Sequence, residues 1–190
     1  DPKTKNDRTW CFWEKEMGFF EEVVYRKWDS ISFLSDEYSS LMNIAPYQYK
    51  MIRGIDFYQY CFKEIANHTN IEVVYGDIKN WRYENSEVVL TLNNQEFRLG
   101  NAQVFNSIHG TREVTKKTIR LLQHFKGWVI ETNEPSFDPN KATMMDFRVS
   151  QQHGTTFAYV LPFSTSSALV EYTLFTKQLL LPDQYDDGLK

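Results

Sequence analysis

The stretch TFAYVLPF at Thr156–Phe163, followed after the short polar link STS by SALVEYTLF at Ser167–Phe175, decides the predicted fold. Both runs have the length of a strand and are rich in aromatic and β-branched side chains, and the link between them supplies turn residues. Two earlier runs, Leu121–Thr132 and Ala142–Ser150, continue this pattern at spacings of about a dozen residues. We therefore predict an antiparallel sheet for the C-terminal part of the chain.

Strict alternation along Ser167–Phe175 places Glu171 on a mostly apolar face. That face is shared by Leu169, Thr173 and Phe175. Burial disfavours the charged form of a carboxyl group and raises its pKa, which suits a proton donor near neutral pH. The alternative is an edge-strand glutamate that points into water, as most glutamates do. The alternation leaves both interpretations open.

A second charged site is predicted in Ala142–Ser150, where Met144, Asp146 and Arg148 share one face of the expected strand. Asp146 and Arg148 could form an ion pair with each other, or they could be independent surface charges. If the strand register brought them close to Glu171, they could also tune its acidity. The sequence does not fix that register.

The first half of the chain predicts one helix among short strands. A helix is expected from Asp56 to about Asn67, because apolar residues recur there at helical spacing and Asp56 can cap the first turn. Lys27–Asn43 predicts a hairpin that could join the C-terminal sheet, and Asn93-Asn94 predicts a tight turn with positive φ. Strands are predicted at Tyr47–Ile52, Ile71–Tyr75, Lys79–Tyr83, Glu87–Leu92, Gln95–Leu99 and Ala102–Phe105.

These elements predict an α+β fold. One αβ region is expected at about 44–110, closed by the break at His109-Gly110-Thr111, and an antiparallel region is expected at about 112–176. A lone helix is too little to cover both faces of a parallel sheet, so further packing elements are expected for the first region.

Composition excludes several classes of function. The net charge is −4 and no basic stripe interleaves with aromatics, which argues against a nucleic-acid partner. No run of about 18 apolar residues could span a membrane. The two cysteines, Cys11 and Cys61, lie far apart, which favours a reducing cytosol over a disulfide framework. No metal site is predicted, because no metal-ligand spacing links the histidines His68, His109, His124 and His153.

Three motifs together resemble the lycopene cyclase family, in its bacterial form. The opening PKTKNDRTWCFW at Pro2–Trp13 and MDFR at Met145–Arg148 are similar to two of its segments. FAYVLP at Phe157–Pro162, followed by LVEYT at Leu169–Thr173, resembles the region that carries the family's catalytic glutamate. The three motifs occur in the family's order, and the likeness runs across essentially the whole chain.

The resemblance implies a flavoprotein that forms β-rings at the ends of lycopene without net redox change. Reduced FAD would be the cofactor, and NAD(P)H could supply its electrons. Residues 1–26 and 44–111 would then belong to an incomplete Rossmann-type FAD/NAD(P)-binding domain, and 27–43 and 112–190 to an antiparallel substrate domain. We expect the enzyme to be cytoplasmic and peripheral to the membrane, because its substrate is long and apolar.

The resemblance also assigns roles to residues. Glu171 would be the acid that protonates the terminal alkene, while Asp146 and Arg148 would have supporting roles. Asn106–Gly110 is given no cofactor role. The sequence contains no GxGxxG, and the family's Gly-rich segments would precede Asp1 and follow Lys190. We therefore expect these residues on their own to bind no flavin and to be inactive.

Two other functions remain open. The first is a flavoprotein monooxygenase or an isoprenoid-lipid reductase of the same plan. The second is a lipid-binding or scaffolding module that docks on a membrane through an aromatic surface, although the same side chains could equally be core packing. Those aromatics are Trp10, Phe12, Trp13, Phe19 and Phe20.

Overall fold

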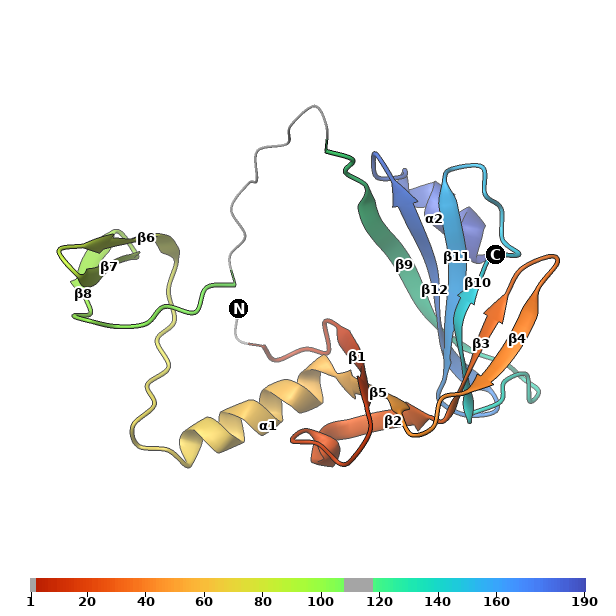
Figure 1. The fold of residues 1–190 in the computed structure, drawn as a ribbon, viewed down its shortest axis with the longest axis horizontal. Coiled ribbons are helices and arrows are strands. Elements are labelled where there is room, and N and C mark those ends of the chain that lie inside the picture. Colours follow the sequence, from red (N-terminus) through yellow and green to blue (C-terminus); the bar gives the residue numbers. More distant parts are fainter. Residues whose placement is uncertain (1–2, 108–117) are drawn as a thin grey trace. The chain divides into compact units, whose positions relative to one another are not determined.

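The computed structural model describes residues 3–107 and 118–190, which are mostly β-sheet with few helices. Two compact units are present: Asp1–Glu64 together with Ile119–Lys190, and Ile65–Thr118. Figure 1 shows the ribbon and the labels used below. The expected functional division of the chain into a dinucleotide-binding part and a substrate part stays a prediction.

A six-stranded sheet dominates the first unit, in the order β4-β3-β10-β11-β12-β9 (Figure 1). The strands are β3 (Ser30–Leu34), β4 (Ser39–Asn43), β9 (Leu122–Glu131), β10 (Lys141–Asp146), β11 (Thr155–Pro162) and β12 (Ser167–Thr176). All neighbours pair antiparallel except β3 with β10. The predicted antiparallel sheet is confirmed, and so is the hairpin that joins it. β12 lies between β11 and β9, so Glu171 is on a central strand.

The first unit also contains a three-stranded sheet, in the order β1-β5-β2. Its strands are β1 (Thr9–Glu14), β2 (Val24–Trp28) and β5 (Gln48–Arg53), with a short 3-10 helix η1 (Glu21–Val23) before β2. Only Asp29 separates β2 from β3, so the chain steps directly from one sheet into the other. The hairpin was predicted to begin at Lys27, which is wrong because Lys27 and Trp28 pair with β5.

Helix α1 (Gly54–Ala66) confirms the predicted helix and follows β5 without a loop. It begins two residues earlier than predicted, so Asp56 lies inside its first turn and pairs with Arg53 instead of capping it. In a dinucleotide-binding fold such a helix would cross between neighbouring parallel strands of one sheet. Here α1 connects β5 to β6, which lie in different sheets. The parallel α/β arrangement expected for the first half is therefore not found in the described ranges 3–107 and 118–190, which are mostly β.

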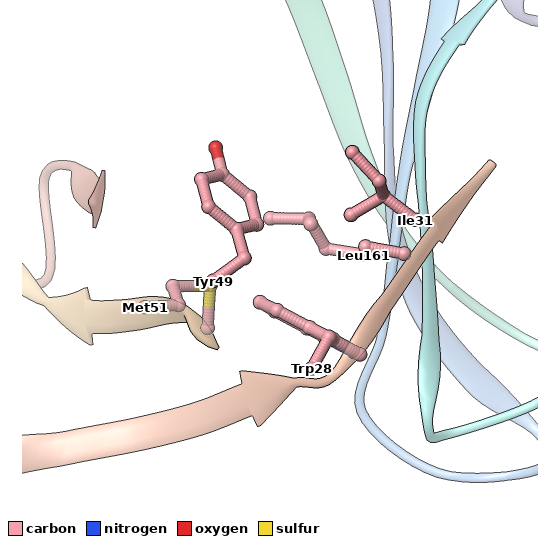
Figure 2. Packing of buried hydrophobic residues seen from close by; sticks show 6 residues of the cluster. Trp28, Ile31, Tyr49, Met51 and Leu161 are labelled. Atoms are coloured by element: carbon pink, nitrogen blue, oxygen red, sulfur yellow. The ribbon is translucent and has the colours of Figure 1, made fainter. Parts of the chain in front are cut away.

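Side chains from both sheets of the first unit form one core. Trp28 and Met51 are fully buried and meet Leu161 and Ala142, which belong to the larger sheet. Figure 2 shows these side chains with Tyr49, whose hydroxyl points away from Met51 and Trp28. Burial of such large apolar side chains is worth about 1.5–3 kcal/mol each. This core fixes β5, and with it Tyr49, against the sheet that carries Glu171.

The N-terminal aromatics divide between packing and exposure. The rings of Trp10 and Phe20 both contact Phe57 of α1, with centroid distances of 5.0 Å and 5.2 Å. Trp13 lies 4.6 Å from the ring of Tyr49. Phe19, in contrast, is 76% exposed. Trp10 and Trp13 are also 37% and 48% exposed, and Phe12 and Phe20 are partly buried, so the expected aromatic surface is divided between packing and solvent.

Helix α2 (Pro182–Leu189) was not predicted. It contacts β9 and β12 on the face opposite Glu171, where the Tyr172 ring comes within 2.5 Å of the position that a Cβ on Gly188 would take. The Tyr185 hydroxyl and the His124 Nδ1 are 2.7 Å apart, which ties the helix to β9. Tertiary contacts thus stabilise a short acidic segment whose own apolar pattern is weak.

The second unit is a three-stranded antiparallel sheet of β6 (Ile78–Glu84), β7 (Glu87–Leu92) and β8 (Gln95–Arg98). The turn at Asn93-Asn94 is confirmed, with φ of 49° and 67°. Strands predicted at Ile71–Tyr75 and Ala102–Phe105 are wrong, since neither segment pairs and Phe105 is 93% exposed. An apolar, β-prone run forms a strand only where a neighbour completes its hydrogen bonds. The break predicted at His109-Gly110-Thr111 lies outside the described residues.

Candidate functional site

A cavity of about 640 Å³ opens within the first unit, beside the face of β12 that carries Glu171. Its lining comes from β1, β5, β9, β10, β11 and β12, together with the residues just before β1. Leu169, Glu171 and Thr173 line it together, as their alternation predicts. Apolar and sulfur-containing side chains make up much of the wall: Cys11, Phe125, Met144, Met145, Phe157 and Leu169.

Glu171 is a partly buried carboxyl group in this cavity. Burial raises the pKa of Glu171 above its usual value. Among the described residues its carboxylate accepts no hydrogen bond and forms no ion pair, so nothing stabilises its charged form. The exposed edge-strand alternative is wrong, because β12 is paired on both sides. The arrangement favours a protonated carboxyl that faces an apolar space.

Two cross-strand neighbours flank Glu171. On β11 its partner is Tyr159, and on β9 its partner is Gly127. The Tyr159 hydroxyl lies 2.6 Å from the hydroxyl of Tyr49, which projects from β5 of the smaller sheet. A short hydrogen bond between buried hydroxyls therefore joins the two sheets at the cavity wall.

Burial keeps this tyrosine pair and the adjacent thiol neutral. Burial contributes most to raising the pKa of Tyr49 and of Tyr159 well above the usual value. Negative charge on neighbouring groups, Cys11 first, would raise both pKa values further. Burial also raises the pKa of Cys11. Hydrogen bonds with Tyr159 and Tyr49 lower this pKa, but burial has the larger effect. These three neighbours of Glu171 are thus uncharged. The charged residues of the lining, Asp7 and Arg8, lie before β1 and pair with each other at 2.9 Å, so Arg8 forms no ion pair with Glu171.

Asp146 and Arg148 form an ion pair with each other. Arg148 Nε donates to Asp146 Oδ1 at 2.8 Å and Nη2 donates to Oδ2 at 2.7 Å, while the Arg148 backbone N–H also donates to Oδ1. The side-chain hydrogen bond from Arg148 is the main cause that lowers the pKa of Asp146. Of the two open interpretations, the mutual ion pair is therefore the one observed.

This ion pair does not line the cavity with Glu171. Met144 and Met145 both do, although strict alternation would place them on opposite faces. The register of β10 shifts between Thr143 and Asp146, and this irregularity turns two successive side chains toward the cavity. The predicted sharing of one face by Met144, Asp146 and Arg148 fails for the same reason. Arg148 also lies beyond the strand, because β10 ends at Asp146 and not at Ser150 as predicted.

Sequence reasoning missed Tyr49, Tyr159 and Gly127 as parts of the site. The tyrosines are separated by 110 positions and meet only because the core fixes β5 against β11. Gly127 had a usable signal, since an isolated glycine inside a strand often marks a close approach of another group.

The start of α1, which follows a strand directly, offers no cradle for a pyrophosphate. At the start of α1, Gly54 N–H donates to the Arg8 carbonyl at 2.8 Å and Ile55 N–H donates to Asn6 Oδ1 at 3.4 Å. A pyrophosphate needs such N–H groups free, and the neighbouring Arg53 is already held by Asp56 in an ion pair at 2.6 Å. Within residues 3–107 and 118–190 there is also no group of three side chains that could hold a metal, and no helix long and apolar enough to cross a bilayer.

Comparison with known proteins identifies the family. The crystal structure of tetracycline destructase Tet(55) is similar at a TM-score of 0.39 and 12% identity, covering 84% of this chain and 42% of that chain. The chain thus spans less than half of that protein's length, and the likeness is too distant to assign a fold or a function. No curated protein matches the chain. The family described as lycopene cyclase protein matches residues 1–188, and this chain therefore belongs to the lycopene cyclase family.

Proposed function

We propose that this chain carries the acid–base centre of a flavin-dependent lycopene cyclase that forms β-rings at the ends of lycopene, and that Glu171 is its proton donor. One observation supports this most strongly: Glu171 lies in a largely apolar cavity, without a hydrogen bond or ion pair among the described residues, and burial raises its pKa. A carboxyl group whose pKa is raised in this way keeps its proton to higher pH, which suits a general acid.

In the proposed reaction, Glu171 acts first as the acid and then as the base. Glu171 gives its proton to one carbon of the terminal double bond, which leaves a tertiary carbocation on the other carbon. The π electrons of a neighbouring double bond then form the ring bond and move the positive charge into the ring. Loss of a proton to the Glu171 carboxylate restores the acid and leaves a β-ring. No atom is gained or lost overall.

The cavity wall suits both the substrate and the cation. Phe125, Phe157 and the two methionines offer apolar contact to a hydrocarbon end group. The faces of aromatic rings also stabilise nearby positive charge. The neutral Tyr49–Tyr159 pair brings no anion that would trap the cation. We assign the Asp146–Arg148 ion pair the supporting role of fixing the end of β10, which carries Met144 and Met145.

The flavin enters this proposal through the family. Reduced FAD, with NAD(P)H as its reductant, is the cofactor that the family implies. The start of α1 does not fit the dinucleotide part of that cofactor, because its first N–H groups are already bonded. No residue of this chain is therefore assigned to the flavin, and the steps above use only the chain's own groups.

A membrane surface is the proposed source of substrate, because a free carotenoid hardly dissolves in water. Met17 and Phe19 are 82% and 76% exposed on the loop between β1 and η1, and such side chains can enter the lipid interface. We propose peripheral association of a cytoplasmic protein. Activity that is the same with and without lipid vesicles would contradict it.

Product analysis tests the function. The full natural polypeptide that carries these residues, supplied with reduced flavin and lycopene, is expected to yield a product of unchanged mass with new β-rings. In D₂O each ring is expected to gain deuterium, because the donated proton exchanges with solvent. A product heavier by one oxygen would indicate a monooxygenase, and one with added hydrogens would indicate a reductase; either would overturn the proposal.

A further inference from the structure

Gly127 faces Glu171 across the β9–β12 ladder and leaves an unusual space there. A Cβ atom placed on Gly127 would lie 2.9 Å from Glu171 Cγ, 3.5 Å from Glu171 Oε1 and 3.3 Å from Leu169 Cδ1. Carbon atoms in contact normally stay about 3.5–4.0 Å apart. The Glu171 side chain thus occupies the space that any other residue at position 127 would fill.

The backbone does not explain the glycine. Positive φ angles occur among the described glycines at Gly100 and Gly154, not at Gly127. The ladder of β9 with β12 also continues without a register shift from Leu122 to Glu131. Gly127 is therefore in ordinary strand conformation, and steric space is what distinguishes the position.

The neighbours determine which group would yield to a larger residue. The strand backbones are held by the continuous ladder, and Tyr159 on the other side of Glu171 is held by its bond to Tyr49. The Glu171 side chain has no hydrogen bond or ion pair among the described residues to hold it. A methyl group at position 127 would therefore displace Glu171 before it displaced the sheet.

We propose that Gly127 is a positioning residue, whose missing side chain leaves the space that sets the place of the Glu171 carboxyl group in the cavity. This inference rests on the proposed role of Glu171. A proton donor must reach its acceptor carbon closely, and a misplacement of about 1 Å can cost roughly 100-fold in rate.

The test is Gly127→Ala in the full natural polypeptide, assayed for ring formation with reduced flavin. We expect kcat to fall about 10- to 100-fold, with KM within about twofold and Tm close to wild type. Val129→Ile is the matched control, because it adds one methylene to the same face of β9 at an exposed position outside the cavity lining. It is expected to leave kcat unchanged.

A double-mutant cycle shows whether Gly127 acts through Glu171. In a Glu171→Gln background, Gly127→Ala is expected to lower the residual rate by less than about twofold, because the placement of a group that no longer donates has no effect. An equal loss in both backgrounds would overturn the inference. Unchanged kcat in Gly127→Ala would also overturn the inference. A large fall in Tm would do the same, because it would show that the added methyl group displaces the sheet and not the Glu171 side chain. If Glu171→Gln itself keeps full activity, the proposed function fails instead.

Discussion

Glu171→Gln is expected to reduce the rate of ring formation by about two to four orders of magnitude, the usual contribution of a well-positioned general acid to catalysis. Glutamine keeps the size of the side chain but has no proton to donate at neutral pH. Because burial already favours the neutral form of Glu171, a neutral amide costs the fold little. Turnover of the full natural polypeptide, followed by chromatography of the carotenoids with reduced flavin supplied, measures the effect.

The control for this variant is Glu131→Gln. Glu131 lies at the end of β9, is exposed and does not line the cavity. The activity of the Glu131→Gln protein is therefore expected to stay at the wild-type level. Full activity of Glu171→Gln would show that another group donates the proton. Asp146 is a poor substitute, because Arg148 lowers its pKa and keeps it ionised. A joint loss of folding and activity would indicate a structural glutamate.

Lys50→Met is expected to destabilise the first unit by about 3 kcal/mol, the typical cost of breaking a buried ion pair. The Lys50 side chain is 1% exposed and its Nζ donates to Glu14 Oε2 at 2.9 Å, to Glu21 Oε2, and to the Glu16 carbonyl at 3.3 Å. Burial lowers the pKa of Lys50, but the hydrogen bonds and charges of Glu21 and Glu14 outweigh it and leave it raised. Without the ammonium group, the carboxylates of Glu14 and Glu21 lose their shared cation, and Glu21 keeps its 3.5 Å ion pair with the half-exposed Lys27.

Urea unfolding measures this loss, and two further variants interpret it. Adding Glu14→Gln and Glu21→Gln to Lys50→Met is expected to restore much of the stability, because the repulsion is removed. Lys63→Met is the control, since Lys63 is 69% exposed and 4.0 Å from Glu22, and its loss is expected to stay within about 0.5 kcal/mol. A Lys50→Met protein as stable as wild type would show that the ion pairs of Lys50 with Glu14 and Glu21 do not contribute to folding stability. Because β5 carries both Lys50 and Tyr49, destabilising this strand would also disturb the cavity.

Local sequence patterns predicted the positions of the strands that line the site. They predicted less well how those strands pair and pack. β12 was predicted within one residue, and alternation along it put Leu169, Glu171 and Thr173 on the side where the cavity lies. Period two fixes which side chains share a face of one strand, as long as the strand is regular. In β10 a register shift broke that condition, and the faces assigned to Met144 and Asp146 failed.

Long-range placement could not be predicted from local patterns. Tyr49 reaches Tyr159 only because β2 continues into β3 and brings the two sheets together, and no periodicity records such a step. Helix α2 had weak signals, Pro182 at its start and Asp183 in its first turn, but its docking depends on Tyr185 meeting His124. The apolar run Ile71–Tyr75 shows the reverse error, since strand propensity without a partner formed no strand.

The pH dependence of kcat/KM tests the role of Glu171 most directly, because this ratio reports the free enzyme's essential acid. The acid is active when protonated, and burial raises its pKa above the ordinary 4.5. As pH rises through that raised pKa, we expect kcat/KM of the wild-type protein to fall about tenfold per pH unit, and the residual rate of Glu171→Gln to lack this fall. A rate that rises with pH over the same range, or the same fall in the Gln variant, would contradict the assignment of Glu171 as the proton donor.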